Sequence, residues 1–314
     1  MPRSPTPSLA PPRLAPGARV ALVCPAGPLH SPLELARAEE SARSFGWEPV
    51  PGEHVLARDG YLAGSDAERA ADLDRALRDP RIDGVWCVRG GYGAMRLLDA
   101  LDWDALARRP RALLGYSDIT ALHAAIRARC DLISFHAPTA RSTLTPFTRR
   151  SLERAVIHGE DPCGAAPDAR VLRGGRAVGR LEGGNLALIT ALVGTPYAAR
   201  LDDAILVLED VSEPVYRIDR MLRHLMLSGA LARVRAIVFG AFTDRGEETE
   251  GTRPLDDVLR EAADAAGVPC IAGAPVGHID DQWTLPLGAL AELDADRRTL
   301  TVLVERAAQH PERT

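Results

Sequence analysis

Short apolar segments and helical segments alternate through the first half of this chain, and this alternation limits the folds that the chain can adopt. The apolar segments end in Gly, Pro or Asp, and segments of helical periodicity follow them. Such a pattern predicts the α/β class, with an N-terminal, mostly parallel sheet flanked by helices. Sites in these sheets lie at the carboxyl ends of strands, which are the turns at 25–28, 89–92 and 115–118. The predicted strands are 19–27, 48–56, 82–91, 111–118 and 131–138, and the predicted helices are 31–46, 65–79, 92–101 and 120–130.

The remainder of the chain predicts three further parts. Residues 1–14 are rich in proline and predict a disordered leader, which leaves 15–145 as the first α/β domain. Residues 146–175 form a Pro/Gly-rich linker with one predicted helix at 148–158. Residues 176–307 again alternate and end in a predicted hairpin, which indicates a second, C-terminal α/β domain.

Charge and composition exclude several classes of function. The net charge of −5 argues against nucleic-acid binding, and no run of about 18 apolar residues predicts a membrane span. Five scattered cysteines suggest neither a disulfide framework nor a metal site, and the N-terminus lacks the apolar core of a signal peptide, so we expect a cytoplasmic protein. All 38 basic residues are arginine. The missing lysine excludes a Schiff base, a Ser-Lys dyad and a P-loop.

Ser117 stands in "GYSD", between a predicted strand and a predicted helix. One interpretation is a helix cap, a frequent role of serine. The other is a nucleophile on a sharp turn at the positive end of a helix. Ile119 occupies the position where the nucleophile elbow of α/β-hydrolases has glycine, so the motif does not match that elbow.

A serine nucleophile needs a base, and without lysine histidine is the natural one. His136 and His278 both end apolar strands, where sites form. The acid that orients such a histidine should emerge from a buried strand, and "AILVLED" ends in Glu209 and Asp210, of which strand alternation turns only one toward a given face. Glu182, beside a Gly-Gly-Asn turn, competes for this role, although a solvated turn carboxylate also explains it.

The glycines of "VRGGYG" (88–93) end a strand before a predicted helix. Phosphate binding, an oxyanion hole and a simple tight turn are three interpretations, although the spacing of a dinucleotide motif is absent. No histidine or cysteine cluster at metal-ligand spacing is present, so we expect no metal.

The motifs around these candidates resemble the LD-carboxypeptidase family of serine peptidases, which includes peptidases that give immunity to microcin C. They run in order over about residues 15 to 305 and together are highly specific. The matching segments are "VRGGYGAMRLL", "LLGYSDITALH", "FHAP", "GRLEGGNLALITALVGTPY", "LVLEDVSEPVYRIDRMLRHL" and "APVGHIDDQWTLPLGALAELD".

The resemblance implies a catalytic triad and an oxyanion hole. Ser117 would be the nucleophile, His278 the general base and acid, and Glu209 the orienting carboxylate, with the N–H groups of Gly91 and Asp118 as oxyanion donors. It also implies a homodimer, an active site at the domain junction and no cofactor. The activity implied is release of terminal D-alanine from murein tetrapeptides in cell-wall recycling, by hydrolysis of an L-to-D amide bond.

Two alternatives stay open. One is a microcin-immunity-type peptidase that cleaves an aminoacyl-nucleotide amide, for which Trp283 offers a ring that could stack on a base, although packing in the core or at the rim of the site is the favoured role for this ring. The other is a non-catalytic small-molecule binding protein in which Ser117 is only a cap. Arg89 and Arg217 are candidates to bind the substrate carboxylate, since no lysine is available. Arg217 has a competing structural role as a partner of nearby acidic residues. The short segment between Pro138 and Gly175 leaves little room for an added substrate loop, which favours the murein peptide.

Overall fold

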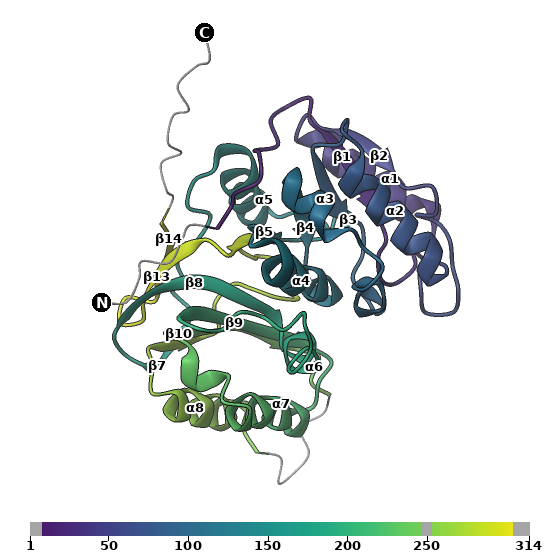
Figure 1. Cartoon of the computed structure of the whole chain (residues 1–314). Helices are drawn as coiled ribbons and strands as arrows, with labels where there is room; N and C mark the ends of the chain where they lie inside the picture. Colours follow the sequence, from purple (N-terminus) through teal and green to yellow (C-terminus); the bar gives the residue numbers. More distant parts are fainter. Residues whose placement is uncertain (1–7, 247–252, 304–314) are drawn as a thin grey trace.

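The computed structural model describes residues 8–246 and 253–303. The structure contains two β-sheets flanked by helices: the first has helices on both faces, with α4 (Thr120–Cys130) on the side toward the second sheet, and the second has helices on one face (Figure 1). The first sheet has the strand order β12-β5-β4-β3-β1-β2, in which β1 to β5 are parallel and β12 is antiparallel to β5. Its strands are β1 (Arg19–Val23), β2 (Glu48–Pro51), β3 (Gly84–Cys87), β4 (Ala112–Gly115), β5 (Ser134–His136) and β12 (Leu285–Leu287).

Apolar residues on both faces of the first sheet hold its helices in place. The core on one face includes residues of α1 and α5, and the core on the other includes residues of α2, α3 and α4. The Ser/Asp start predicted for 65–79 forms a capping box, in which Ser65 and Glu68 each bond the other's backbone N–H. These helices are α1 (Pro32–Ser44), α2 (Asp66–Arg78), α3 (Trp103–Arg108), α4 (Thr120–Cys130) and α5 (Pro146–Leu152), which continues into a π-helical turn (Glu153–His158).

The helix predicted at 92–101 is wrong. Only a 3₁₀ turn forms there (Ala94–Leu97), after Gly91 and Gly93 with φ of 115° and 125°. The next helix, α3, begins later, where the Asp102 carboxylate accepts a hydrogen bond from the Ala105 N–H. The glycine-rich segment therefore remains a loop above β3, which leaves its backbone N–H groups outside any helix.

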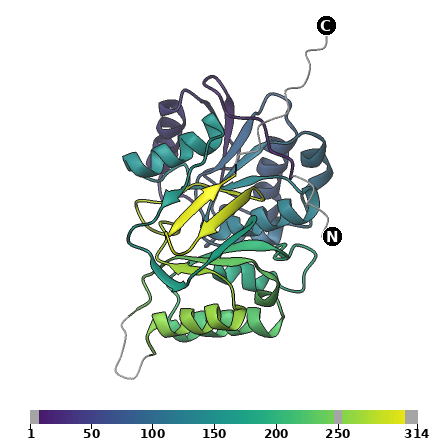
Figure 2. The same ribbon diagram turned by 90° about the vertical axis from the view of Figure 1, so that its left-hand side faces the viewer.

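The second sheet has eight strands in the order β6-β14-β13-β8-β9-β10-β11-β7, with a parallel centre from β8 to β11. One face packs on the helices α6 (Leu186–Ala191), α7 (Val215–Leu227) and α8 (Leu255–Ala266). The predicted hairpin is β13 and β14, drawn in yellow in Figure 2. The strands are β6 (Gly164–Ala165), β7 (Arg170–Arg173), β8 (Arg176–Asn185), β9 (Ala204–Val211), β10 (Ala236–Thr243), β11 (Cys270–Ala272), β13 (Leu290–Asp294) and β14 (Thr299–Val302).

The two sheets share chain segments, so the predicted domain boundaries do not separate them. β12 comes from the C-terminal half of the chain but pairs with β5 of the first sheet. The predicted linker supplies two edge strands of the second sheet, since β6 pairs with β14 and β7 with β11. These strand pairings connect the two halves of the chain through backbone hydrogen bonds.

The predicted leader is partly wrong. Residues 1–7 lie outside the described part of the chain, but Leu14 is fully buried in the first core. The Leu9 N–H donates to Asp131 O (3.1 Å), and the Ile133 N–H donates to Leu9 O (2.9 Å). Residues 8–14 thus bury apolar surface and pair with the chain before β5. Within the described ranges, no helix has the length and apolar character needed to cross a membrane.

Candidate active site at the junction of the two sheets

Ser117 occupies a strained turn directly after β4. Its φ is 65°, in the left-handed region that costs a residue with a side chain about 1–2 kcal/mol. The turn packs against the glycine-rich loop so closely that a Cβ on Gly90 would lie 2.9 Å from Ser117 Cβ and 3.1 Å from its Oγ. Glycine at position 90 therefore lets the backbone pass beneath the serine hydroxyl.

The predicted capping role of Ser117 is wrong. The serine begins a 3₁₀ turn (Ser117–Ile119), and α4 starts only at Thr120, with no side-chain cap. Within the described residues, Ser117 Oγ makes no hydrogen bond, so its hydroxyl is not engaged in holding the helix.

Asp118 joins the serine turn to the glycine-rich loop. Its buried carboxylate accepts a hydrogen bond from the Ala94 N–H at 2.8 Å. Burial raises the pKa of Asp118 to about 6, although the bond from Ala94 opposes that rise. The side chain is thus a structural anchor, and the backbone N–H of Asp118 remains next to Ser117.

Asp118→Asn should make stability less dependent on pH. A carboxyl pKa that folding raises from 3.8 to about 6 favours the folded state at low pH and loses that contribution as the pH rises through 6. The difference corresponds to about 3 kcal/mol. Because the unfolded carboxyl is already partly ionised at pH 4, we expect the free energy of unfolding of Asp118→Asn to rise by about 2 kcal/mol relative to wild type between pH 4 and pH 7, measured by urea unfolding. Exposed Asp104→Asn is the control, and an equal pH dependence in both variants contradicts the prediction.

Strand pairing places Glu209 at the junction. Glu209, on β9, lies in register with Asn185 of β8, whose N–H donates to Thr120 Oγ1 at the start of α4 (3.0 Å). Glu209 is fully buried. Asp210 points the other way, to the start of α6, where it accepts bonds from Nδ2 of the N-cap residue Asn185 (2.8 Å) and from the Ala187 N–H (3.0 Å). The strand alternation expected from the sequence therefore separates the two carboxylates.

His278 meets Glu209 from the loop after β11. Its Nδ1 lies 2.8 Å from Glu209 Oε2, and a fifth of its side chain is exposed. Gly277 is required beside it, because its φ is 114° and a Cβ there would lie 2.8 Å from Glu209 Oε2. The imidazole also packs on Tyr116, with ring centroids 4.8 Å apart, so His278 lies beside the residue that precedes Ser117.

His136, the competing histidine, lies deeper. It contacts the edge of the Tyr116 ring at 5.9 Å between centroids, and neither ring nitrogen has a hydrogen-bond partner among the described residues. Burial lowers its pKa to about 3, so the ring is neutral at physiological pH. Sequence reasoning missed Tyr116, which packs between the two histidines. Its position in "GYSD" was the available signal.

Three other candidates have structural positions. Glu182 is not solvated as the turn interpretation supposed, because it is buried and bonds Arg127 Nε at 2.8 Å. Arg217 is half exposed and lies 3.5 Å from Glu213, which fits its competing structural role. Trp283 is 1% exposed and belongs to the core between the sheets, which fits the packing role rather than the stacking role considered for its ring.

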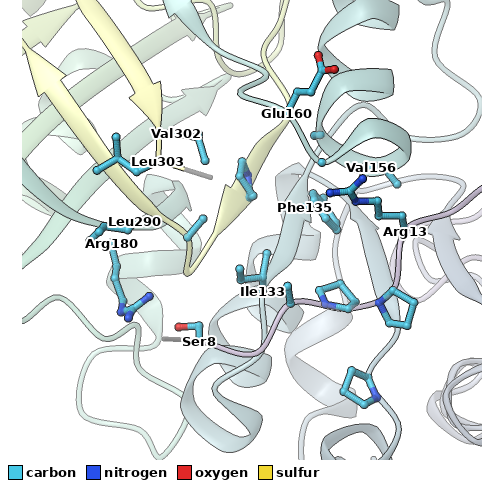
Figure 3. Close-up of a pocket in the computed structure, with 18 residues that line it drawn as sticks. Ser8, Arg13, Ile133, Phe135, Val156, Glu160, Arg180, Leu290, Val302 and Leu303 are labelled. Carbon is cyan, nitrogen blue, oxygen red and sulfur yellow. The ribbon is translucent and has the colours of Figure 1, made fainter. Parts of the chain in front are cut away.

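Two pockets differ in their relation to these residues. A pocket of about 520 Å³ adjoins the glycine-rich loop and is lined in part by Arg89 and Gly91. A larger one of about 670 Å³ lies between the segment 8–13 and the β13–β14 side, where Ile133, Phe135 and Leu290 give it apolar walls (Figure 3). None of the predicted site residues lines the larger pocket. Across residues 8–246 and 253–303, no His, Cys, Asp and Glu side chains gather in a group that could hold a metal ion.

Comparison with known proteins identifies the family of the chain. The LD-carboxypeptidase N-terminal domain pattern matches residues 20–137, and the LD-carboxypeptidase C-terminal domain pattern matches 178–293. The chain is 43% identical to a putative carboxypeptidase of Streptomyces coelicolor (93% of this chain, 95% of the relative). It is 36% identical to the murein tetrapeptide carboxypeptidase of Pseudomonas aeruginosa (89% and 94%).

More distant relatives extend the comparison to structure and to a second activity. The muramoyltetrapeptide carboxypeptidase of Oxalobacter formigenes superposes with a TM-score of 0.81 at 28% identity, covering 91% of this chain and 98% of that one. A microcin C7 self-immunity protein of Escherichia coli is 27% identical (85% and 87%). Since both family domains match in order and together span most of the chain, the protein belongs to the LD-carboxypeptidase family of peptidases.

Proposed function

We propose that this protein is a serine-type LD-carboxypeptidase that hydrolyses the L-to-D amide bond of murein tetrapeptides and releases D-alanine. The observation that carries the proposal is the 2.8 Å contact between His278 Nδ1 and the fully buried Glu209, beside the strained turn of Ser117. A buried carboxylate that holds one imidazole nitrogen leaves the other free to accept a proton. The names of the carboxypeptidase relatives support the same substrate class.

In the proposed reaction, His278 Nε2 takes the proton of Ser117 as its Oγ attacks the carbonyl carbon of the scissile amide. Glu209 keeps the His278 proton on Nδ1 and stabilises the imidazolium that forms. That imidazolium then protonates the nitrogen of the leaving D-alanine, and the amide C–N bond breaks. Water, activated by His278, attacks the ester on Ser117 and releases the shortened peptide.

The oxyanion of the tetrahedral intermediate needs preorganised donors. We assign these to the N–H groups of Gly91 and Asp118, because Gly90 touches Ser117 and the Asp118 carboxylate ties the two loops together. Each such donor contributes about 3–4 kcal/mol to lowering the barrier.

Gly91→Ala should therefore reduce kcat by about 10²- to 10³-fold. Gly91 has φ 115°, and an added Cβ would lie 3.0 Å from Gly27 Cα and 3.1 Å from its N, so the loop must shift. Gly164→Ala is the matched control, because Gly164, on β6, also has positive φ (126°) but open space around it. Steady-state D-alanine release measures both, and equal losses in the two variants contradict the assignment.

A substrate panel tests the proposed function. Purified protein is incubated with the tetrapeptide L-Ala-γ-D-Glu-diaminopimelate-D-Ala and with an aminoacyl sulfamoyl adenosine, and the products are identified by mass spectrometry. We expect D-alanine from the first substrate. Hydrolysis of the nucleotide alone would establish the microcin-immunity type of activity, and a folded protein inert on both would favour a binding protein.

The microcin-immunity alternative rests on the 27% identical relative. The burial of Trp283 removes the aromatic side chain that the sequence offered for stacking on a base. The tetrapeptide is therefore the preferred substrate.

Place of action and assembly follow from the same proposal. We propose that the enzyme acts in the cytoplasm on peptides recovered from the cell wall, as a homodimer and without a cofactor. Sedimentation velocity measures the assembly, and activity after dialysis against a chelator tests the absence of a metal requirement.

A further inference from the structure

A small pocket with two arginines opens directly beside the glycine-rich loop. Its volume is about 520 Å³, and it shares Gly91 with the proposed oxyanion hole. The side chains that give it chemical character come from three loops: His30, Arg58, Tyr61, Arg89 and Tyr92.

Arg89 is held in place by the pocket wall. Its Nη1 donates to Pro28 O and to His30 Nε2, the latter at 2.8 Å. Among the described residues, Nε and Nη2 of this guanidinium have no hydrogen-bond partner. Two N–H donors on a fixed planar group match the geometry of a carboxylate.

The pocket has an excess of positive charge. Neither Arg58 nor Arg89 lies within salt-bridge distance of a carboxylate in the part of the chain that the structure describes. Arg58 has one hydrogen bond, a long one of 3.4 Å from its Nε to Gly60 O. Glu34, a carboxylate whose charge acts on Arg89, is occupied by the His30 N–H (2.6 Å) and by Arg141 Nη1 (2.8 Å).

Two exposed tyrosines border the pocket. The rings of Tyr61 and Tyr92 meet edge to face with centroids 5.5 Å apart, and 68% and 54% of their surfaces are exposed. Because the two rings pack against each other, each loses less conformational entropy when a ligand binds than an isolated side chain would. Their faces offer an apolar wall next to the cationic groups.

We propose that this pocket, with Arg89 and Arg58 as its cationic groups, binds the terminal carboxylate of the peptide substrate. The inference rests on the proposed function, since it uses the position of the scissile carbonyl. Successive Cα atoms lie about 3.8 Å apart, so the terminal carboxylate is within one residue of the carbonyl that Gly91 N–H would face. A pocket lined by Gly91 lies within that distance of the scissile carbonyl.

The test compares two tetrapeptides that differ only at the C-terminus, one ending in free D-alanine and one in D-alaninamide. For wild type we expect kcat/KM to be about 100-fold higher on the acid, because a charged pair contributes that much in a partly desolvated site. Arg89→Met and Arg58→Met should each lose about 10- to 100-fold on the acid, mainly through KM, with little change on the amide. Arg37→Gln, exposed on α1, is the control.

The outcomes separate this inference from the proposed function. Arg58→Met keeps the test valid if Arg89→Met does not fold, since Arg58 is exposed. Wild type inert on both peptides would contradict the proposed function. Equal cleavage of acid and amide, unchanged in the variants, would leave that function intact and overturn the pocket assignment. The pocket assignment would also be overturned if the variants changed the preference between diaminopimelate and lysine at the third position of the peptide, while the ratio of kcat/KM on the acid to kcat/KM on the amide stayed the same.

Discussion

Ser117→Ala should abolish D-alanine release, with kcat reduced by at least about 10⁴-fold. The proposed mechanism forms an ester on Ser117 Oγ, and an alanine at this position has no oxygen with which to form it. Folding should be unaffected, because Ser117 Oγ makes no hydrogen bond within the described residues and alanine and serine bear similar strain at a φ of 65°. Product release followed by mass spectrometry measures the loss, and urea unfolding measures stability.

Ser117→Gly and Ser228→Ala sharpen this test. Glycine adopts positive φ readily, so Ser117→Gly should be about 1 kcal/mol more stable than Ser117→Ala and equally inactive. At the end of α7, the Ser228 hydroxyl bonds only Leu225 O among the described residues, so Ser228→Ala should keep wild-type activity. Activity that survives Ser117→Ala would show that another group attacks the substrate.

The regular part of the fold could be predicted from local patterns, and the exchanged segments could not. Alternating apolar and helical segments predict β1 to β5 because each strand is buried by helices close in sequence. β12 is three residues long and pairs with β5, about 150 residues away, so no local signal marks it. The burial of Leu14 and the pairing of Leu9 likewise depend on distant partners. Proline content alone therefore suggested disorder at 8–14.

The site shows the same division. The sequence indicated Glu209 and His278 as strand-end residues, and the structure brings them within hydrogen-bond distance. Strand alternation did not indicate which of Glu209 and Asp210 faces the junction, because it predicts opposite faces without saying which is which, and only the family resemblance pointed to Glu209. Packing was the favoured role for the apolar ring of Trp283, but its place beside β12 could not be predicted, since nothing local shows that β12 crosses to the first sheet. The direction of a strand-end side chain and the burial of a ring are set by contacts between segments that are distant in the sequence.

Glu209→Gln should reduce kcat by about 10³- to 10⁴-fold while the protein stays folded. The amide keeps the volume of the buried side chain but loses the charge that stabilises the His278 imidazolium, and it also permits the wrong tautomer of the ring. Since the interaction acts in the transition state, KM should change little. Stopped-time D-alanine assays over a range of tetrapeptide concentrations separate kcat from KM.

Two neighbouring carboxylates provide the comparison. Asp210→Ala removes the carboxylate that accepts hydrogen bonds from Asn185 Nδ2 and from the Ala187 N–H at the start of α6. The variant should lose about 1–3 kcal/mol of stability and keep activity within about tenfold of wild type. Glu182→Ala leaves Arg127 buried without its main partner and should cost about 3–5 kcal/mol, again without a comparable fall in kcat. Glu209 alone of the three contacts His278. Equal kcat losses in the three variants would mean that the carboxylates act through the stability of the junction, and the orienting role assigned to Glu209 would be wrong.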